Sequence, residues 1–163
     1  MSIESTSLSL RTTPGKGKGV FTERAFAVGE RILSFTGPIQ TAAEITDEDH
    51  CIQIQGNPDL FLGPSGGLDD YVNHSCDPNT GLREDSDGLH LEAISEIPRG
   101  EELTFDYATC MYDDPWSMPC SCGSTRCRGK VGNFRDLAEP VRRKYLKLGV
   151  VPLFALGPET KKG

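Results

Sequence analysis

Aromatic residues and histidines are scarce in this sequence, and long apolar runs are missing from it. Of 163 residues only 7% are aromatic, with one tryptophan and three histidines. No apolar run approaches the roughly 20 residues that a membrane-spanning helix needs. The first residues, MSIESTSLSLRTT, have neither a basic leader nor an apolar core. We therefore expect an intracellular protein, cytoplasmic or nuclear, that is not secreted by a classical signal and has no membrane partner.

Positive charge is also in short supply. The 17 lysines and arginines are outnumbered by 24 aspartates and glutamates, so the net charge is -7. Proteins that bind nucleic acid usually present a basic face, so we expect no direct contact with DNA or RNA. An acidic protein suits a basic partner such as a lysine-rich peptide, although solubility alone is the plainer interpretation. Composition leaves the oligomeric state unknown.

The remaining composition predicts one globular domain built from short pieces. Hydrophobic residues at 36% and charged residues at 25% are typical of a folded chain with one core. Eighteen glycines and eleven prolines divide the chain and favour short strands and loops over long helices. Short strands are predicted within residues 19–37 around a turn at 28–30, and at 51–55, 59–64, 89–97 and 101–108.

Two helices are predicted. The first is short and covers residues 42–48. The second, EPVRRKYLKL at residues 139–148, is better supported because Pro140 suits a first turn and Gly149 suits a stop. Its apolar residues Val141, Tyr145 and Leu148 fall at helical spacing, which predicts one buried face.

Cysteines carry the first chemical signal. Cys120, Cys122 and Cys127 lie close together among serines and glycines, in a stretch too polar to build a core. Inside a cell such cysteines are thiols or metal ligands rather than disulfides, and three thiolates form one side of a tetrahedral zinc site. Cys76 is our choice for the fourth ligand. The competing candidates are Cys51, Cys110 and, more weakly, His74, and the alternative is a set of unliganded thiols.

Three further motifs suit a ligand site without establishing one. The stretch NHSCDPN, residues 73–79, offers amides and an imidazole, although an ordinary turn loop has the same composition. In ELTFDY, Phe105 and Tyr107 fall on one face of a predicted strand, which is equally usual in a core. The glycines of KGKGV, residues 16–20, allow a backbone to pass close to a ligand, but a lone G-x-G is weak evidence.

Taken together and in order, GKGVF, NHSCDPN, IPRGEELTFDY and CSCGSTRCRG resemble the motifs of the SET-domain protein-lysine N-methyltransferases, from about Gly15 to Gly129. The resemblance implies a mainly β fold of several small sheets with a knot-like crossing, short helices and a C-terminal helix. It also implies a SET catalytic domain over residues 1–115, a post-SET-like zinc-binding segment over 116–135, and a C-terminal helix and tail over 136–163.

The resemblance implies an activity and its residues. A methyl group of S-adenosylmethionine would pass to a lysine of a protein substrate, such as a histone, with Tyr107 as the catalytic residue. Phenylalanine at 105 favours the addition of more than one methyl group. The residues implied for the lysine channel are Phe105, Tyr71 and His50; for the methyl donor, Gly17, Lys18, Gly19, Asn73, His74, Tyr107 and Phe134; for one structural zinc, Cys76, Cys120, Cys122 and Cys127. Phe134 suits a place in the core equally well.

Some positions depart from the family pattern. Asp70 stands where many members have arginine or alanine, and Pro38 stands where many have glutamate. Members also tend to have a tyrosine on the strand that lines the channel, and the nearest residues here are His50 and Cys51. An altered channel wall favours a second hypothesis, a zinc-stabilised module that binds S-adenosylmethionine or a peptide with little or no turnover.

Overall fold

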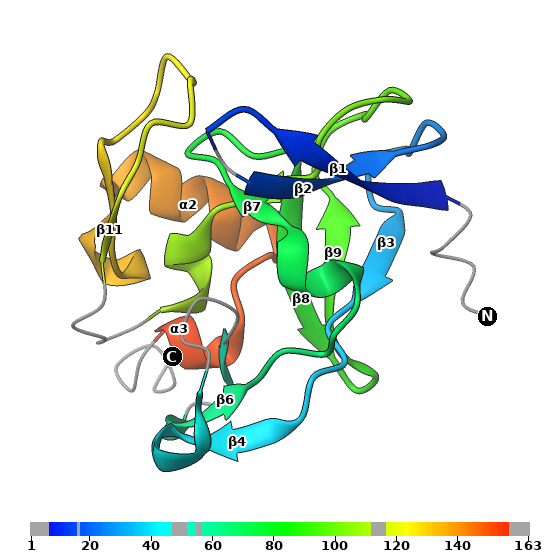
Figure 1. The fold of residues 1–163 in the computed structure, drawn as a ribbon. Coiled ribbons are helices and arrows are strands. Elements are labelled where there is room, and N and C mark those ends of the chain that lie inside the picture. The colour runs from blue at the N-terminus through cyan, green and yellow to red at the C-terminus, as the bar shows by residue number, and fades with distance from the viewer. Residues whose placement is uncertain (1–6, 16, 47–51, 55–56, 112–116, 157–163) are drawn as a thin grey trace.

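The chain folds into several small sheets that surround one core. The structure is a computed structural model, and it describes residues 7–15, 17–46, 52–54, 57–111 and 117–156. Two sheets have three strands and three have two strands within these residues. This arrangement confirms the prediction of a mainly β fold with short helices (Figure 1).

An N-terminal hairpin forms one side of the molecule. Strand β1 (Leu8–Thr13) pairs antiparallel with β2 (Gly17–Thr22). The sequence does not predict β1, whereas β2 is the first of the two short strands predicted within residues 19–37 around a turn at 28–30. The turn near Gly29, which has a φ of 86°, leads to β3 (Arg31–Ser34) in a different sheet.

The central sheet has the order β3-β9-β8 and is antiparallel throughout. Strand β8 (Thr80–Asp85), which the sequence did not predict, pairs with β9 (Gly88–Ala93), which lies within the predicted strand 89–97. Leu33, Leu82 and Leu91 from the three strands are almost completely buried. These leucines place the middle of the hydrophobic core at this sheet.

The third sheet, with the order β4-β6-β5, lies at one end of the molecule (Figure 1). Its strands are β4 (Ile39–Thr41), β5 (Ile52–Ile54) and β6 (Asn57–Leu62). The helix predicted at 42–48 is a single 3-10 turn, η1 (Ala42–Glu44), and Ile45 is already extended with a ψ of 124°. Glu44 satisfies the start of this turn by accepting hydrogen bonds from the backbone and hydroxyl of Thr41, and residues 47 and 48 lie outside the described residues.

Two segments far apart in the sequence pair in parallel at the centre. Strand β7 (Asn73–His74) lies beside β10 (Thr104–Phe105), and η3 (Leu68–Tyr71) precedes β7. The strand predicted at 101–108 is therefore much shorter than expected. It ends because Asp106 accepts a hydrogen bond from the Ala108 backbone and caps the 3-10 helix η4 (Tyr107–Cys110).

The C-terminal part of the described chain packs against this centre. Strands β11 (Met118–Pro119) and β12 (Lys130–Val131) form a small ribbon, and η5 (Phe134–Asp136) follows. Helix α2 (Glu139–Leu148) has the predicted bounds and ends at Gly149, whose φ of 71° is the left-handed conformation that favours glycine. A last helix is α3 (Leu153–Leu156).

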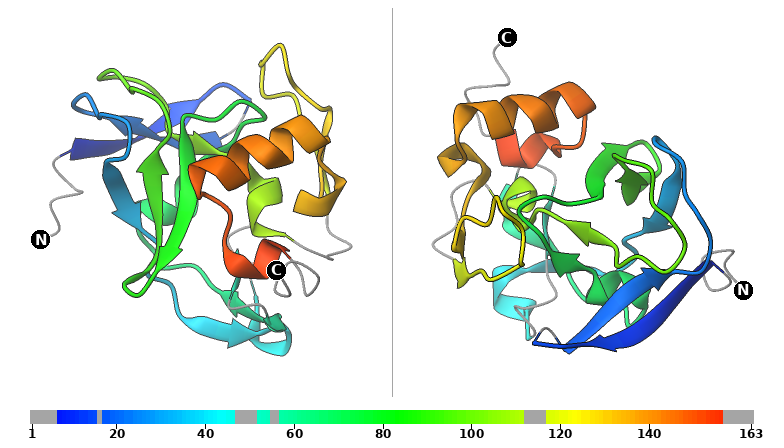
Figure 2. Two further views of the ribbon diagram at one scale, coloured as in Figure 1. Left: turned by 180° about the vertical axis from the view of Figure 1, so that it is seen from behind. Right: turned by 90° about the horizontal axis from the view of Figure 1, so that it is seen from above.

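Helix α2 lies across the molecule near β8, as two further views show (Figure 2). Tyr145 of α2 is buried, and Arg83 of β8 donates a hydrogen bond to the Leu148 carbonyl. Gly81 of β8 faces Val150 so closely that a Cβ at residue 81 would lie 2.5 Å from the Val150 Cβ. In the part of the chain that the structure describes, no helix has the length and apolarity needed to cross a membrane.

Candidate active site and metal site

Tyr107 lies at the junction between β10 and η4, and several contacts hold it in place. Its hydroxyl donates a hydrogen bond to the Val72 carbonyl oxygen at 2.6 Å, and its backbone N–H donates to Nδ1 of His74 at 3.0 Å. Its ring lies edge-on to His74 with centroids 5.3 Å apart. The sequence-predicted residues Tyr107 and His74 are thus brought into direct contact by the pairing of β7 with β10.

Two further aromatic rings continue from the Tyr107 ring. The centroids of Phe105 and Tyr107 are 4.9 Å apart, and Phe35 meets Phe105 edge-on at 6.0 Å. Phe105 is only 4% exposed. Sequence reasoning did not select Phe35, because an aromatic residue after a strand is most often plain core. These three rings form one continuous apolar wall.

Residues of the glycine motif meet Asn73 at the end of the N-terminal hairpin. The side-chain amide of Asn73 donates to the Lys18 carbonyl at 2.9 Å and to Oε1 of Glu102 at 2.8 Å. A Cβ at Gly19 would lie 2.6 Å from this Glu102 atom, so a larger residue here would have to displace the Glu102 carboxylate. Gly17 has a φ of 75° and open space where a Cβ would stand. The predicted donor-binding residues Gly17, Lys18, Gly19 and Asn73 therefore lie together.

Three other predicted residues have different outcomes. The centroid of the Tyr71 ring, which was predicted to line the lysine channel, lies 5.7 Å from the Lys18 ammonium in a cation–π contact. Phe134 in η5 is buried and packs within the hydrophobic core, as its alternative interpretation requires. His50 lies outside the described residues, as do Cys51 and Lys16. The roles of Tyr71 and Phe134 stay predictions.

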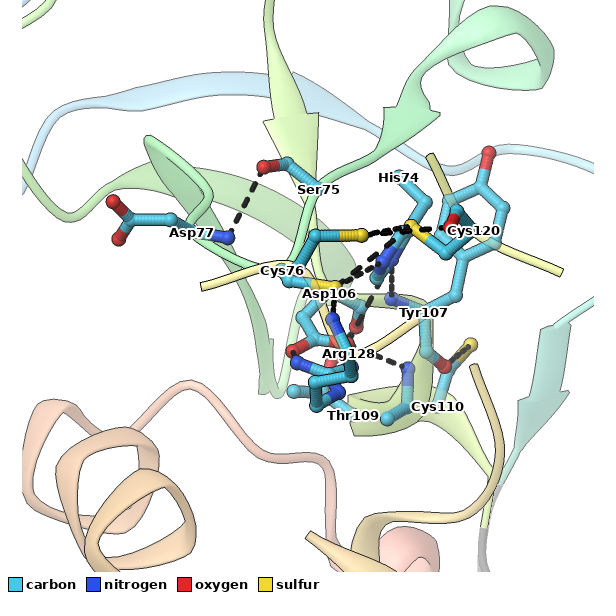
Figure 3. Close-up of polar contacts among 12 residues, drawn as sticks. His74, Ser75, Cys76, Asp77, Asp106, Tyr107, Thr109, Cys110, Cys120 and Arg128 are labelled. Atoms are coloured by element: carbon cyan, nitrogen blue, oxygen red, sulfur yellow. Dashed lines mark hydrogen bonds and ion pairs between the residues drawn. The ribbon is translucent and has the colours of Figure 1, made fainter. Parts of the chain in front are cut away.

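The four cysteines chosen from the sequence form one cluster. The sulfur atoms of Cys76, Cys120, Cys122 and Cys127 all lie within 4.8 Å of one another. Cys120 lies 3.8 Å from Cys76 and 3.7 Å from Cys127 (Figure 3). A tetrahedral site with Zn–S bonds of about 2.3 Å has S···S edges of about 3.8 Å. The cluster therefore fits a structural zinc, and it joins the NHSC loop to the β11–β12 segment.

The remaining described cysteine has another partner. The Cys110 thiol donates a hydrogen bond to the Tyr107 carbonyl at 3.0 Å and is not part of the cluster. The His74 ring is also outside the set of four, although its Nε2 lies 3.3 Å from the Cys76 sulfur. Four thiolates are the donor set typical of closed, structural zinc sites.

The thiols of the cluster ionise unequally. Burial raises the pKa of Cys76 and raises that of Cys120 to about 12. Burial also opposes ionisation of Cys122, but hydrogen bonds from the backbone of Cys76 and Ser124 and from neighbouring thiols outweigh it and lower its pKa to about 6. A bound metal ion would deprotonate all four thiols, so these unequal pKa values apply to the cluster without a metal ion.

His74 connects the cluster to Tyr107. Because the Tyr107 N–H donates to Nδ1, that nitrogen carries no proton, and the proton of the neutral ring must be on Nε2. Nε2 then donates to the Cys76 sulfur at 3.3 Å. Metal-binding groups commonly have such hydrogen-bonded neighbours, which fix their orientation.

Asp106, which the sequence did not lead us to select, has a fully buried side chain, and one of its oxygens lies 3.7 Å from Nδ1 of His74. The Arg128 guanidinium donates two hydrogen bonds of 2.8 Å to its two oxygens, and the Tyr145 hydroxyl donates a third at 2.9 Å. Burial alone would lower the pKa of Arg128, but the hydrogen bonds and charge of Asp106 outweigh it and raise that pKa. Arg128 and Tyr145 follow Asp106 by 22 and 39 residues, and partners so far apart leave no recognisable pattern in a single sequence.

Asp70, which departs from the family pattern, and its neighbour Asp69 both have local hydrogen-bond partners. Asp70 accepts hydrogen bonds from the backbone N–H groups of Ser65 and Gly66 at 2.9 and 2.7 Å. Asp69 accepts one from the Ser65 hydroxyl and one from the Thr36 backbone. Both carboxylates thus stabilise the loop before η3, and Asp69 also ties it to the segment that follows β3.

The sequence matches a known family over the residues that carry this site. The family model described as the SET domain matches residues 17–108, which is more than half of the chain. The chain therefore belongs to the SET-domain family. The match ends within η4, so the cysteine segment and helix α2 lie beyond it, and the division predicted at residues 115 and 135 stays a prediction.

Named relatives and solved structures agree with this family. Histone-lysine N-methyltransferase ash1 of Drosophila melanogaster is 32% identical over 143 residues, which cover 79% of this chain and 6% of that protein. Histone-lysine N-methyltransferase 2B of Homo sapiens is 30% identical over 127 residues, which cover 69% of this chain and 5% of that protein. The chain thus spans a small part of the length of these relatives.

A solved structure shows the same fold at lower identity. KRYPTONITE in complex with mCHH DNA, an H3(1-15) peptide and SAH matches with a TM-score of 0.63 and 20% identity, over 77% of this chain and 29% of that one. The likeness confirms the predicted SET-domain fold.

Proposed function

We propose that the chain is a protein-lysine N-methyltransferase that uses S-adenosylmethionine. The observation that carries the proposal is the placement of Tyr107: its hydroxyl donates to the Val72 carbonyl, and its ring packs on Phe105, which Phe35 contacts in turn. The same pairing of strands brings Asn73 and His74 next to it. Two relatives that match most of this chain are named histone-lysine N-methyltransferases, which supports the proposal.

The residues present fit the methyl donor. The donor would lie against the backbone of residues 17–19 and the Asn73–His74 strand, where the Asn73 amide is fixed in orientation by its two acceptors. The positive φ of Gly17 and the open space where its Cβ would stand agree with a backbone that a ligand approaches closely. When bound, S-adenosylmethionine supplies an electrophilic methyl group attached to a sulfonium.

The chain itself prepares the acceptor. A free lysine has a pKa of about 10.4 and is protonated at neutral pH, whereas a nucleophilic amine must be neutral. The apolar wall of Phe35 and Phe105 disfavours the charged ammonium and excludes water. The Tyr107 hydroxyl orients the amine for an in-line approach, since alignment of the reacting atoms supplies much of the rate. Phenylalanine at 105 keeps the channel roomy and favours more than one methyl transfer.

The cysteine cluster supports this site without taking part in the reaction. Bound to Cys76, Cys120, Cys122 and Cys127, a zinc ion would hold the β11–β12 segment against the NHSC loop and contribute folding free energy.

The proposed substrate is a lysine-containing protein, and a histone is the specific candidate. The names of the relatives and the net charge of -7 both favour a basic protein. A histone substrate would make a nuclear location the natural one.

A methyl-transfer assay tests the proposal. The chain would be incubated with labelled S-adenosylmethionine and core histones, and separately with a cell lysate, beside Tyr107→Phe. Val28→Ala serves as the control, because Val28 is 61% exposed and takes no part in the contacts described for Tyr107. Label on lysine that is retained in the control and lost in Tyr107→Phe supports the enzyme. Donor binding in calorimetry without any labelled protein favours the binding module. Absence of donor binding contradicts the enzyme and any module that binds the donor, and leaves a peptide-binding module.

A further inference from the structure

Asp106 separates Phe105 from Tyr107 in the sequence, and its carboxylate is the meeting point of three segments. Its side chain is 0% exposed, yet it accepts hydrogen bonds from Arg128, Tyr145 and the Ala108 backbone. Arg128 follows Cys127 in the cysteine segment, and Tyr145 lies on the buried face of α2. Both side chains come from outside residues 17–108, which match the SET domain.

A second connection reaches Tyr107 from the cysteine segment. The Arg128 backbone N–H donates to the Cys76 sulfur at 3.4 Å, and Cys76 accepts from His74, which in turn accepts from the Tyr107 N–H. The backbone at Tyr107 is therefore held from two sides, by His74 at its own N–H and by Asp106 at the N–H of Ala108.

We propose that Asp106 is a positioning residue for Tyr107, and that Tyr145 and Arg128 hold it in place. Helix α2 and the cysteine segment would then determine the direction of the Tyr107 hydroxyl. The inference rests on the proposed function for its effect on catalysis, but its structural part stands on the contacts alone. A carboxylate with this role is expected in a buried place with several fixed donors, because a shift of about 1 Å in a reacting group is enough to slow a reaction about a hundredfold.

Arg128 alone does not explain the arrangement. A carboxylate that only neutralised Arg128 would need the two oxygens that the guanidinium already contacts. Here one oxygen also caps η4 at Ala108, and the other also accepts from Tyr145. The Tyr145 hydroxyl is therefore a donor that can be removed while the ion pair and the cap remain.

The test uses Tyr145→Phe, which removes this hydroxyl and keeps the ring that packs in the core. Leu146→Ala is the matched control, because Leu146 is the next residue of α2 and is 46% exposed. The full chain, labelled with ¹⁵N-tyrosine, would be examined by NMR; the sequence has four tyrosines, and Tyr107→Phe identifies the Tyr107 signal. We expect the Tyr107 amide to exchange with solvent about tenfold faster in Tyr145→Phe, as for loss of one hydrogen bond to a charged group, and to be unchanged in Leu146→Ala.

Kinetics with core histones provide the second readout. In Tyr145→Phe we expect kcat to fall about tenfold, with KM for S-adenosylmethionine changed less than twofold and zinc content retained. Asp106→Asn is expected to reduce kcat further, and adding Tyr145→Phe to it should have little additional effect, because Tyr145 acts through Asp106.

The two proposals fail in different ways. An unchanged Tyr107 amide in a folded Tyr145→Phe variant overturns the positioning role, whatever the activity is. A changed amide in a protein that methylates nothing upholds the structural part and counts against the proposed function. Equal changes in the Leu146→Ala control would show a general loosening of α2 and would also overturn the proposal.

Discussion

The central sheet and the cysteine segment are two parts of the molecule that different forces hold in place. In the β3-β9-β8 sheet, Leu33, Leu82 and Leu91 are buried against one another and against other apolar residues. Among the described residues 117–131, the buried apolar side chain is Val131, and the segment is joined to the rest by sulfur and charge through Cys76 and Asp106.

This difference has a consequence for folding. Burial of apolar surface contributes roughly 25 cal/mol per Å² and needs no ligand, so the sheet forms from its own side chains. Four thiols and a buried carboxylate contribute little until their partners are present, because unpaired buried polar groups cost free energy. The segment is therefore expected to depend on a metal ion, whereas the sheet is expected to depend on packing.

The largest expected effect is on the cysteine segment. In Cys122→Ser one of four sulfur ligands is lost. The apparent binding free energy of structural zinc in small sites is roughly 10–16 kcal/mol, and it contributes to folding. We expect metal analysis to find one zinc per chain in the unmodified protein and almost none in this variant. Cys110→Ser is the control, because Cys110 is a cysteine outside the cluster. Full zinc content in Cys122→Ser would refute the four-cysteine site.

A change in the sheet should act on stability and leave the metal in place. Leu91 is 0% exposed, so Leu91→Ala should lower the free energy of unfolding by about 2–5 kcal/mol through lost burial and a cavity. Urea unfolding followed by circular dichroism measures this change, with the exposed Val28→Ala expected to stay within about 0.5 kcal/mol. Loss of zinc in folded Leu91→Ala would show that the two regions are not independent.

A third variant tests where the sheet meets the C-terminal part. A Cβ at Gly81 would lie 2.5 Å from the Val150 Cβ, so Gly81→Ala should destabilise the protein by about 1–3 kcal/mol through overpacking. Because the two residues touch, Val150→Ala in the same chain should cost less than the sum of the single changes. If urea unfolding shows that the double change costs the sum of the two single changes, residues 81 and 150 are not in contact.

The smallest expected effect is a pH dependence within the sheet. Burial and the nearby Arg31 lower the pKa of His90 below its usual 6.5. The unfolded chain therefore binds a proton more readily than the folded one, and this contribution to stability is complete above pH 6.5 and declines as the pH falls below it. In His90→Leu the decrease in melting temperature between pH 7.5 and 5.5 should be smaller. An unchanged decrease would mean that other groups cause it.

Local patterns predicted much of the fold correctly. Helix α2 has the predicted bounds because Pro140, Gly149 and the apolar spacing are all local signals. The strands near 52–54, 57–62 and 88–93 follow from alternation within a few residues. The strand predicted at 101–108 is reduced to β10 at 104–105, because η4 begins at Tyr107, and the helix predicted from residue 42 is a 3-10 turn over 42–44. At Tyr107 the cap by Asp106 decided the outcome.

The sequence by itself determined that this is a β protein of the SET-domain family, and it identified the residues Tyr107, Asn73 and His74 and the four cysteines as a set. The order of the motifs and the chemistry of their residues are sufficient for these predictions, because both can be read directly from the amino-acid sequence. Only the tertiary structure decided that Phe35 joins the aromatic wall and that Asp106 is shared by Arg128 and Tyr145. Contacts between distant residues depend on how the segments cross in space, and one sequence carries no periodic signal for such a crossing.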